Sequence, residues 1–254
     1  MRVHRLWRSE EPGDTAPAPP LPGPALMHQS WRDVLFVHWP VDPEDVAPLL
    51  PPHTRPDTLD GAAHVGLVAF HVPGTRVAGV LPAGSFDEVN VRVYAVDGHG
   101  RRSTVFLTMD VSSAHIAAAG RAIAGVPYLW ADVSLRQGPE RHAGAVRRRL
   151  PVGAAARWSF RVGERLEETP PLEEFLTARW GLHVRHLGAT LWIRNRHRPW
   201  PLYRAELLHY EGNLLRSAGL SPLTEEPLSV LWSPGTETGF TPSTVPAPAG
   251  GEGP

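Results

Sequence analysis

The fold is decided by the stretch Phe86-Asp87-Glu88-Val89-Asn90-Val91-Arg92-Val93-Tyr94-Ala95-Val96, in which apolar and polar side chains alternate. Successive side chains of a β-strand point to opposite faces, so this alternation predicts a strand over Glu88–Val96. One face is apolar and consists of Val89, Val91, Val93 and Ala95. The other face carries a carboxyl, an amide, a guanidinium and a phenol, from Glu88, Asn90, Arg92 and Tyr94. Such a mixture is typical of a site that orients a small polar ligand.

The next predicted strand, Thr104–Val111, follows a hairpin turn at Asp97-Gly98-His99-Gly100. Its alternation separates an apolar set, Val105, Leu107, Met109 and Val111, from a second set of Thr104, Phe106, Thr108 and Asp110. If the hairpin pairs its apolar faces, Asp110 shares one polar surface with Glu88, Asn90 and Arg92. In a barrel, that surface either faces solvent, as in most half-buried antiparallel sheets, or lines an internal cavity. Both interpretations stay open at the level of the sequence.

The same period of two recurs along most of the chain. It predicts eight further strands, at residues 34–39, 64–71, 129–135, 144–150, 156–162, 189–194, 203–211 and 228–232. Three short helices are predicted from capping residues and apolar spacing, at Pro43–Leu50, Ser113–Ala124 and Leu172–Trp180. Short strands in this number favour a mainly β (α+β) fold, in which an antiparallel sheet forms a closed or partly open barrel.

Composition changes at both ends of the chain. Residues 1–26 and 233–254 are rich in Pro, Gly and small polar residues, which bury too little apolar surface to offset the loss of chain entropy. Between them, no linker-like stretch interrupts residues 27–232. We therefore expect a single barrel domain over 27–232, flanked by two disordered tails.

The composition excludes several kinds of chemistry. All 25 basic residues are arginines, and the chain contains no cysteine. A lysine Schiff base, a P-loop and a kinase-type site are therefore excluded, as are thiolate nucleophiles, disulfides and cysteine-bound zinc. The 13 histidines show no convincing metal-ligand spacing, so we expect neither a metal nor another cofactor.

Charge and hydropathy bear on the partners. A net charge of −1 argues against a nucleic-acid partner, because duplex binding depends on many contacts between cations and phosphates. No secretion signal and no run of about 18 apolar residues is visible, so we expect a cytoplasmic protein without a membrane partner. The expected partner is a small-molecule ligand, and a homo-oligomer is compatible with the sequence.

Three stretches of the chain resemble the YqjF-like proteins, a bacterial family of unassigned function. They are the strand at residues 86–94, the segment from Gly120-Arg121 to Gly125-Val126-Pro127-Tyr128, and Arg198-Pro199-Trp200-Pro201-Leu202. The resemblance covers Trp31 to Trp232. More distantly, the chain is similar to the acetoacetate decarboxylase superfamily, which implies a closed or cone-shaped antiparallel barrel with the active site inside.

The pattern of that superfamily is incomplete here. In its enzymes, a strand carrying a glutamate precedes a Gly-Arg-Glu…Gly-x-Pro-Lys stretch, and the lysine forms the Schiff base. The matching residues, in this order, are Glu88, Gly120, Arg121 and Pro127. Ala122 stands in place of the second glutamate, and Tyr128 in place of the lysine. The resemblance therefore implies that the pocket persists without its amine nucleophile.

The polar face and the resemblance together suggest roles for seven residues. Glu88 is the expected general acid or base and Tyr128 the proton donor, while the expected ligand-binding residues are Asn90, Arg92, Tyr94, Asp110 and Arg121. Simpler interpretations are that Arg121 lies on a helix surface and that Tyr128 is an ordinary core residue.

Three functions remain open. The favoured one is a barrel that binds a small ligand bearing a carboxylate or keto group, without Schiff-base chemistry. The second is a cofactor-independent lyase, isomerase or hydrolase that uses Glu88 as general acid or base. The third is a structural subunit whose barrel is filled by its own side chains.

Overall fold

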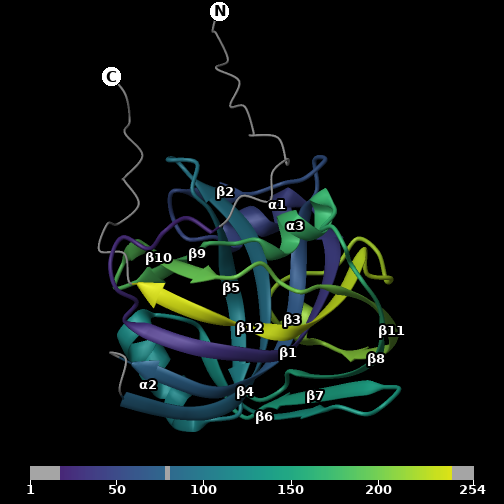
Figure 1. The fold of residues 1–254 in the computed structure, drawn as a ribbon. Helices are drawn as coiled ribbons and strands as arrows, with labels where there is room; N and C mark the ends of the chain where they lie inside the picture. Colours follow the sequence, from purple (N-terminus) through teal and green to yellow (C-terminus); the bar gives the residue numbers. More distant parts are fainter. Residues whose placement is uncertain (1–17, 78–80, 242–254) are drawn as a thin grey trace, which may run out of the picture.

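The computed structural model describes residues 18–77 and 81–241, and most of this part of the chain is β-strand (Figure 1). The strands are β1 (Met27–Val41), β2 (Thr54–Pro56), β3 (Ala63–Val77), β4 (Leu81–Asp97), β5 (Arg102–Val111), β6 (Tyr128–Arg136), β7 (His142–Arg148), β8 (Ala155–Arg165), β9 (Gly181–His186), β10 (Ala189–His197), β11 (Tyr203–Gly212) and β12 (Ser229–Thr241). The helices are α1 (Pro43–Val46), the 3-10 helix η1 (Ala47–Leu49), α2 (Ala114–Ala124), α3 (Pro171–Thr177) and α4 (Leu214–Ser217). The prediction of a mainly β fold with short helices is confirmed.

Five antiparallel strands, in the order β12-β1-β3-β4-β5, form a central sheet. From β5, strand pairing returns to β12 by two routes, one through β6, β7, β8 and β11 and the other through β9 and β10. The link between β11 and β12 consists of two residue pairs, Tyr203 with Trp232 and Arg204 with Leu231. The antiparallel-rich sheet thus curves round in the manner of a partly open barrel, as the sequence predicted (Figure 1).

The central sheet is buried on both faces. On one face, Leu35 and Val91 belong to a core cluster that includes Trp158 of β8. On the other face, Phe36 and Phe86 belong to a second cluster, to which α2 and the segment before β11 contribute. Alternate residues of β4 therefore enter two different interiors, and neither face of this strand is a solvent face.

Two of the helices, α1 and α2, begin where a short polar side chain satisfies a free backbone N–H group. The carboxylate of Asp42 accepts a hydrogen bond from the backbone N–H of Glu44 at 2.8 Å and so starts α1. The hydroxyl of Ser113 accepts one from the N–H of Ile116 at 3.4 Å and starts α2. Gly125 ends α2 with a φ of 68°, in the left-handed region that favours glycine. Both ends of α2 lie where the sequence predicted them.

Several boundaries differ from those expected. The last strand, β12, continues to Thr241, so the predicted end of the domain at Trp232 is too early. Pairing with β1 on one side and β10 on the other gives this segment its backbone hydrogen bonds, despite a composition rich in Gly and Thr. The third helix ends at Thr177, and β9, which follows it, was not predicted. At Gly181, the first residue of β9, a side-chain β-carbon would lie 2.3 Å from Nε1 of Trp192.

A β-bulge changes the predicted pairing of β4 with β5. Val91 is paired with Thr108, but its neighbour Arg92 is paired with Phe106, which leaves Leu107 as the extra residue. The bulge reverses the alternation of β5 relative to β4. Asp110 is consequently paired with an apolar residue, Val89, and lies on the face opposite to Glu88. The prediction that Asp110 shares a surface with Glu88 is therefore wrong.

Asp110 instead forms a buried ion pair with Arg148 of β7. The guanidinium donates two hydrogen bonds, from Nε to Oδ1 at 2.7 Å and from Nη2 to Oδ2 at 2.9 Å. The two side chains are 5% and 1% exposed, for Arg148 and Asp110 respectively. This bidentate ion pair connects β5 with β7 across the intervening strand β6.

We predict that Arg148→Met destabilises the fold by about 3–5 kcal/mol, because it leaves a buried carboxylate without its counter-ion. The matched control is Arg147→Met on the same strand, where the arginine is 76% exposed and pairs with Asp132. This control is expected to cost less than about 1 kcal/mol. Urea unfolding of both variants measures the difference, and equal effects would contradict the structural role of the Asp110–Arg148 pair.

Candidate functional site

Glu88 lies on β4 with its carboxyl inside the protein, and 3% of the residue is exposed. Its neighbours across the sheet are Phe70 of β3 and Val111 of β5, both apolar. The side-chain amide of Asn90 donates a hydrogen bond to Oε1 at 2.9 Å, and the hydroxyl of Tyr128 donates to Oε2 at 3.4 Å. Glu88, Asn90 and Tyr128 thus form a small polar group in an otherwise apolar interior, which we call the Glu88 cluster.

Burial raises the pKa of Glu88 from its ordinary value of 4.5 to about 7. The cause is desolvation, since a carboxylate loses its hydration when it enters an apolar interior. Hydrogen bonds from Asn90 and Tyr128 and the positive charge of Arg92 lower the pKa, but less than burial raises it. Near neutral pH the side chain can therefore both accept and donate a proton.

Tyr128 reaches Glu88 because α2 packs closely behind it. A β-carbon at Gly120 of α2 would lie 2.2 Å from the Tyr128 ring, so only glycine allows this approach. Burial and the neighbouring Glu88 raise the pKa of the Tyr128 hydroxyl well above its ordinary value. Tyr128 is consequently a neutral hydrogen-bond donor.

Asn90 presents an acceptor next to Glu88. The residue is 1% exposed, and its Nδ2 atom is used in the bond to Glu88. Within the part of the chain that the structure describes, its Oδ1 atom is buried without a hydrogen-bond partner. A buried acceptor without a partner costs free energy that a bound donor would recover.

Arg92 and Tyr94 lie on the same face as Glu88, but both hold α3 in place. The guanidinium of Arg92 donates to the backbone carbonyl of Leu176 in α3 at 3.1 Å, and the Tyr94 hydroxyl donates to the same oxygen at 2.7 Å. The hydroxyl also lies 2.7 Å from Nε2 of His38 and accepts from Nε of Arg92 at 3.2 Å. This network docks α3 against β1 and β4.

Arg121 and Asp110 lie away from the Glu88 cluster. Arg121 is exposed on α2, and its guanidinium donates to the backbone carbonyl of Tyr128 at 3.3 Å. It therefore lies at the helix surface, as the simpler interpretation of the sequence had it. Asp110 occupies the opposite face of the sheet, as described above. Of the seven candidate residues, three are joined by side-chain hydrogen bonds at the Glu88 carboxyl, namely Glu88, Asn90 and Tyr128, while Arg92 and Tyr94 bond to each other and to α3.

One set of residues was missed by the sequence analysis. Asp33, His71 and Asp87 line a pocket of about 320 Å³ on the other face of the central sheet. The alternation of β4 does place Asp87 on the face opposite to Glu88, so the sequence alone could have predicted that Asp87 lies outside the Glu88 cluster. Nothing in the periodicity predicts that Asp33 joins it, because its position depends on a local irregularity of β1.

Comparison with known proteins identifies the family of this chain. Residues 28–237 match the family model DUF2071, described as "Uncharacterized conserved protein (COG2071)". The chain belongs to the DUF2071 family. A relative of this DUF2071 protein is the "Uncharacterized protein YqjF" of Bacillus subtilis (strain 168), 28% identical over 186 residues, which are 71% of this chain and 76% of the relative. The resemblance to YqjF-like proteins is thereby confirmed.

Solved structures confirm the fold of this DUF2071 protein. The enduracididine biosynthesis enzyme MppR complexed with pyruvate has a TM-score of 0.59 at 18% identity, with 87% of this chain and 91% of that chain covered. Acetoacetate decarboxylase from Legionella pneumophila has a TM-score of 0.57 at 15% identity, with 96% and 98% covered. At these identities the likeness establishes an acetoacetate decarboxylase-like fold and leaves the activity to be argued separately.

Within residues 18–77 and 81–241, no group of three or more His, Asp or Glu side chains is arranged to hold a metal ion. Among the helices of the same residues, none has the length and hydropathy needed to cross a membrane.

We predict that Glu88→Gln changes how the stability of the protein depends on pH. The folded protein keeps the Glu88 proton up to about pH 7, whereas the unfolded chain releases it near 4.5. The stability that this proton contributes is therefore complete below 4.5 and is lost as the pH rises through about 7. Relative to the glutamine variant, the wild type should lose roughly 3 kcal/mol across this range.

Urea unfolding of both proteins between about pH 4 and about pH 8 measures this difference. Buried histidines act in the opposite direction, since burial lowers the pKa of His64 and His197 to about 4. They are present in both proteins, so their contribution cancels in the difference. A stability difference that does not vary with pH would show that Glu88 is not protonated at neutral pH.

Proposed function

We propose that this DUF2071 protein binds a small molecule bearing a keto or carboxylate group at the Glu88 cluster, through hydrogen bonds and without a Schiff base. The observation that carries the proposal is the buried Glu88 carboxyl with its pKa of about 7. In its neutral form this carboxyl donates a hydrogen bond, which is what a keto oxygen or a carboxylate accepts. The free Oδ1 of Asn90 offers an acceptor to a hydroxyl or amine of the same ligand.

The position of Arg92 favours a ligand with a negatively charged carboxylate. Its bonds to Leu176 and Tyr94 use Nη2 and Nε, so Nη1 takes no part in them. The positive charge acts on the Glu88 site, because it lowers the pKa of Glu88. A related fold, that of MppR, is described in complex with pyruvate, which carries both a keto group and a carboxylate.

We expect pyruvate or a slightly larger keto acid, such as oxobutyrate, to bind the wild type, and Glu88→Leu, which removes the hydrogen-bond donor, to weaken this binding by about tenfold or more. A hydrogen bond to a charged group is worth roughly 1.5–3 kcal/mol, which sets this magnitude. Ligand-observed NMR and calorimetric titration measure the affinity. The matched control is Glu206→Leu, at a carboxylate on β11 that is 63% exposed, and it should leave binding unchanged.

Absence of binding by a panel of keto acids and simple carboxylates would count against the proposal. It would favour the alternative of a barrel filled by its own side chains. Native mass spectrometry of the purified protein, which detects a co-purified small molecule, gives an independent test of the same point.

Borohydride reduction tests the claim that no Schiff base forms. Because the chain has no lysine, reduction in the presence of pyruvate should leave every side chain unmodified. The one remaining primary amine is the α-amino group of the chain. Peptide mapping by mass spectrometry distinguishes that group from any internal adduct, and a reduced adduct within residues 28–237 would refute the prediction.

A second candidate function follows from the same pKa. A carboxyl that titrates near pH 7 suits a general acid or base, for example in moving a proton at the carbon next to a carbonyl group. Oxobutyrate incubated in deuterated water should then exchange a proton at that carbon, faster as the pH rises through about 7. Glu88→Gln should slow this exchange by about 100-fold or more, since general-base catalysis typically contributes that much. Binding without exchange would leave the first proposal standing and exclude this one.

A further inference from the structure

A pocket of about 320 Å³ opens on the face of the central sheet opposite to the Glu88 cluster. Its apolar floor comes from β1, β3, β6 and β8, and consists of Leu35, Ala69, Leu135, Trp158 and Phe160. Its polar wall consists of two carboxylates, two imidazoles, an amide and a guanidinium, from Asp33, Asp87, His71, His142, Gln137 and Arg136. An apolar floor with a few convergent polar groups is the usual construction of a small-molecule site, and the volume lies within the usual range of about 300–1,000 Å³.

Asp33 owes its position in this pocket to an irregularity of β1. The residue has a φ of 54°, in the left-handed region that side chains other than glycine seldom adopt. The pairing of β1 with β3 shifts between Arg32 and Leu35, so Asp33 is the point at which the regular register is interrupted. Bulges of this kind redirect a side chain and are frequent next to functional sites.

The carboxylate of Asp33 has no strong counter-ion. Burial raises its pKa, and the neighbouring His142 and His71 and a hydrogen bond from Gln137 lower it less. Arg32, next to it in the chain, is paired with Glu237. Within the described residues, no ion pair includes Asp33. A half-buried carboxylate in this state gains free energy when a cation binds beside it.

His71 and Asp87 form the second polar element of the wall. Nδ1 of His71 lies 2.7 Å from Oδ1 of Asp87, and the side chains are 43% and 25% exposed. The backbone N–H of Asp87 donates to the hydroxyl of Ser112 at 2.9 Å. Ser112 lies at the start of the β5–α2 connection, so this bond holds Asp87 of β4 against that connection. Asp87 uses Oδ1 for His71, so its second carboxylate oxygen adds an acceptor to this wall.

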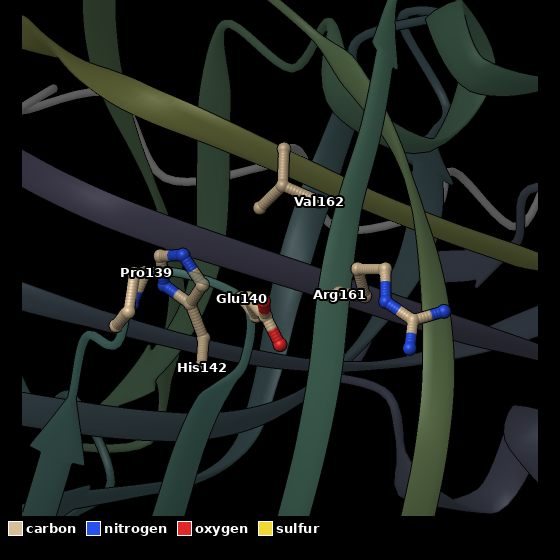
Figure 2. Close-up of a pocket in the computed structure, with 5 residues that line it drawn as sticks. All are labelled: Pro139, Glu140, His142, Arg161 and Val162. Carbon is tan, nitrogen blue, oxygen red and sulfur yellow. The ribbon is translucent and has the colours of Figure 1, made fainter.

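A smaller pocket of about 250 Å³ adjoins the first, because His142 lines both (Figure 2). Figure 2 shows the side chain of Arg161 extending away from His142. Its guanidinium is paired with Glu206 of β11 at 2.8 Å. The positive charge of Arg161 is thus already neutralised. Among the residues that line the larger pocket, the exposed Arg136 carries a positive charge, against the two carboxylates of Asp33 and Asp87.

We propose that this pocket is a second ligand site, which binds a small organic ammonium ion with an aromatic body. The ammonium group donates hydrogen bonds to the carboxylates of Asp33 and Asp87. The aromatic body packs on the floor, where Trp158 and Phe160 offer ring surface to it. This site is separate from the Glu88 cluster, since Asp87 and Glu88 are consecutive residues of β4 that point to opposite faces of the sheet.

The test compares three probes of the same shape, namely phenethylammonium, phenethyl alcohol and hydrocinnamate, in NMR titrations at about pH 8, where exposed histidines are neutral. The ammonium ion should bind at least about tenfold more tightly than either the alcohol or the carboxylate, because it alone brings a positive charge to the carboxylates of Asp33 and Asp87. Its ring protons should show intermolecular contacts with the Trp158 indole.

Asp33→Asn should lower the affinity for phenethylammonium by about tenfold or more. Asparagine also tolerates a positive φ, so the backbone of β1 is kept. Asp87→Asn is a second variant with the same expected direction. The matched controls are Asp132→Asn, which lies outside the pocket, and Glu88→Gln, which alters the other site; both should bind the probe as the wild type does.

Tighter binding of the alcohol or of hydrocinnamate than of the ammonium ion would overturn the proposal. So would full affinity in a folded Asp33→Asn or Asp87→Asn variant. Loss of binding in Glu88→Gln would place the probe at the Glu88 cluster and would equally refute a second site.

Discussion

The rest of the structure depends on one constraint, the burial of both faces of the central sheet. A sheet covered on one side can leave its polar residues in water, but β4 has an interior on either side. A polar side chain on it therefore costs free energy unless it finds a partner inside the protein. Asn90, Arg92 and Tyr94 find theirs in Glu88 and in the backbone of α3, and these contacts fix how the helix lies on the sheet.

This burial also decides the chemistry of Glu88. Burial raises the pKa of Glu88 to about 7, and Arg92, which would lower it, is held at α3 by its bond to Leu176. On the opposite face, Arg148 contacts the carboxylate of Asp110 with two hydrogen bonds. Two acids on neighbouring strands thus lie in different surroundings, one without an ion pair among the residues that the structure describes and one held in a buried ion pair, according to the position of the nearest guanidinium.

The sequence predicted the parts of the fold that depend on periodicity. Alternation located ten of the strands, and it placed Glu88 and Asn90 on a common face because β4 itself is regular there. It failed at Asp110, since a bulge at Leu107 reverses the faces of β5 without a mark in the residue pattern. It also missed β9, which pairs with β10 after a helix shorter than expected. Asp33 could not be found in this way, because its position depends on a backbone turn inside a strand.

The adjacency of Asp87 and Glu88 has a consequence for how such a chain can vary. Deleting or inserting one residue in β4 between Asp87 and the following hairpin would turn every side chain of the preceding segment to the opposite face of the sheet. The carboxyl of Glu88 would then enter the interior on the opposite face of the central sheet, and the apolar residues on either side of it would change faces as well. A point substitution can alter the interior on one face alone, whereas a change in the length of the strand alters the interiors on both faces at once. Length variation among proteins of this fold is therefore expected in connecting loops and not in β4.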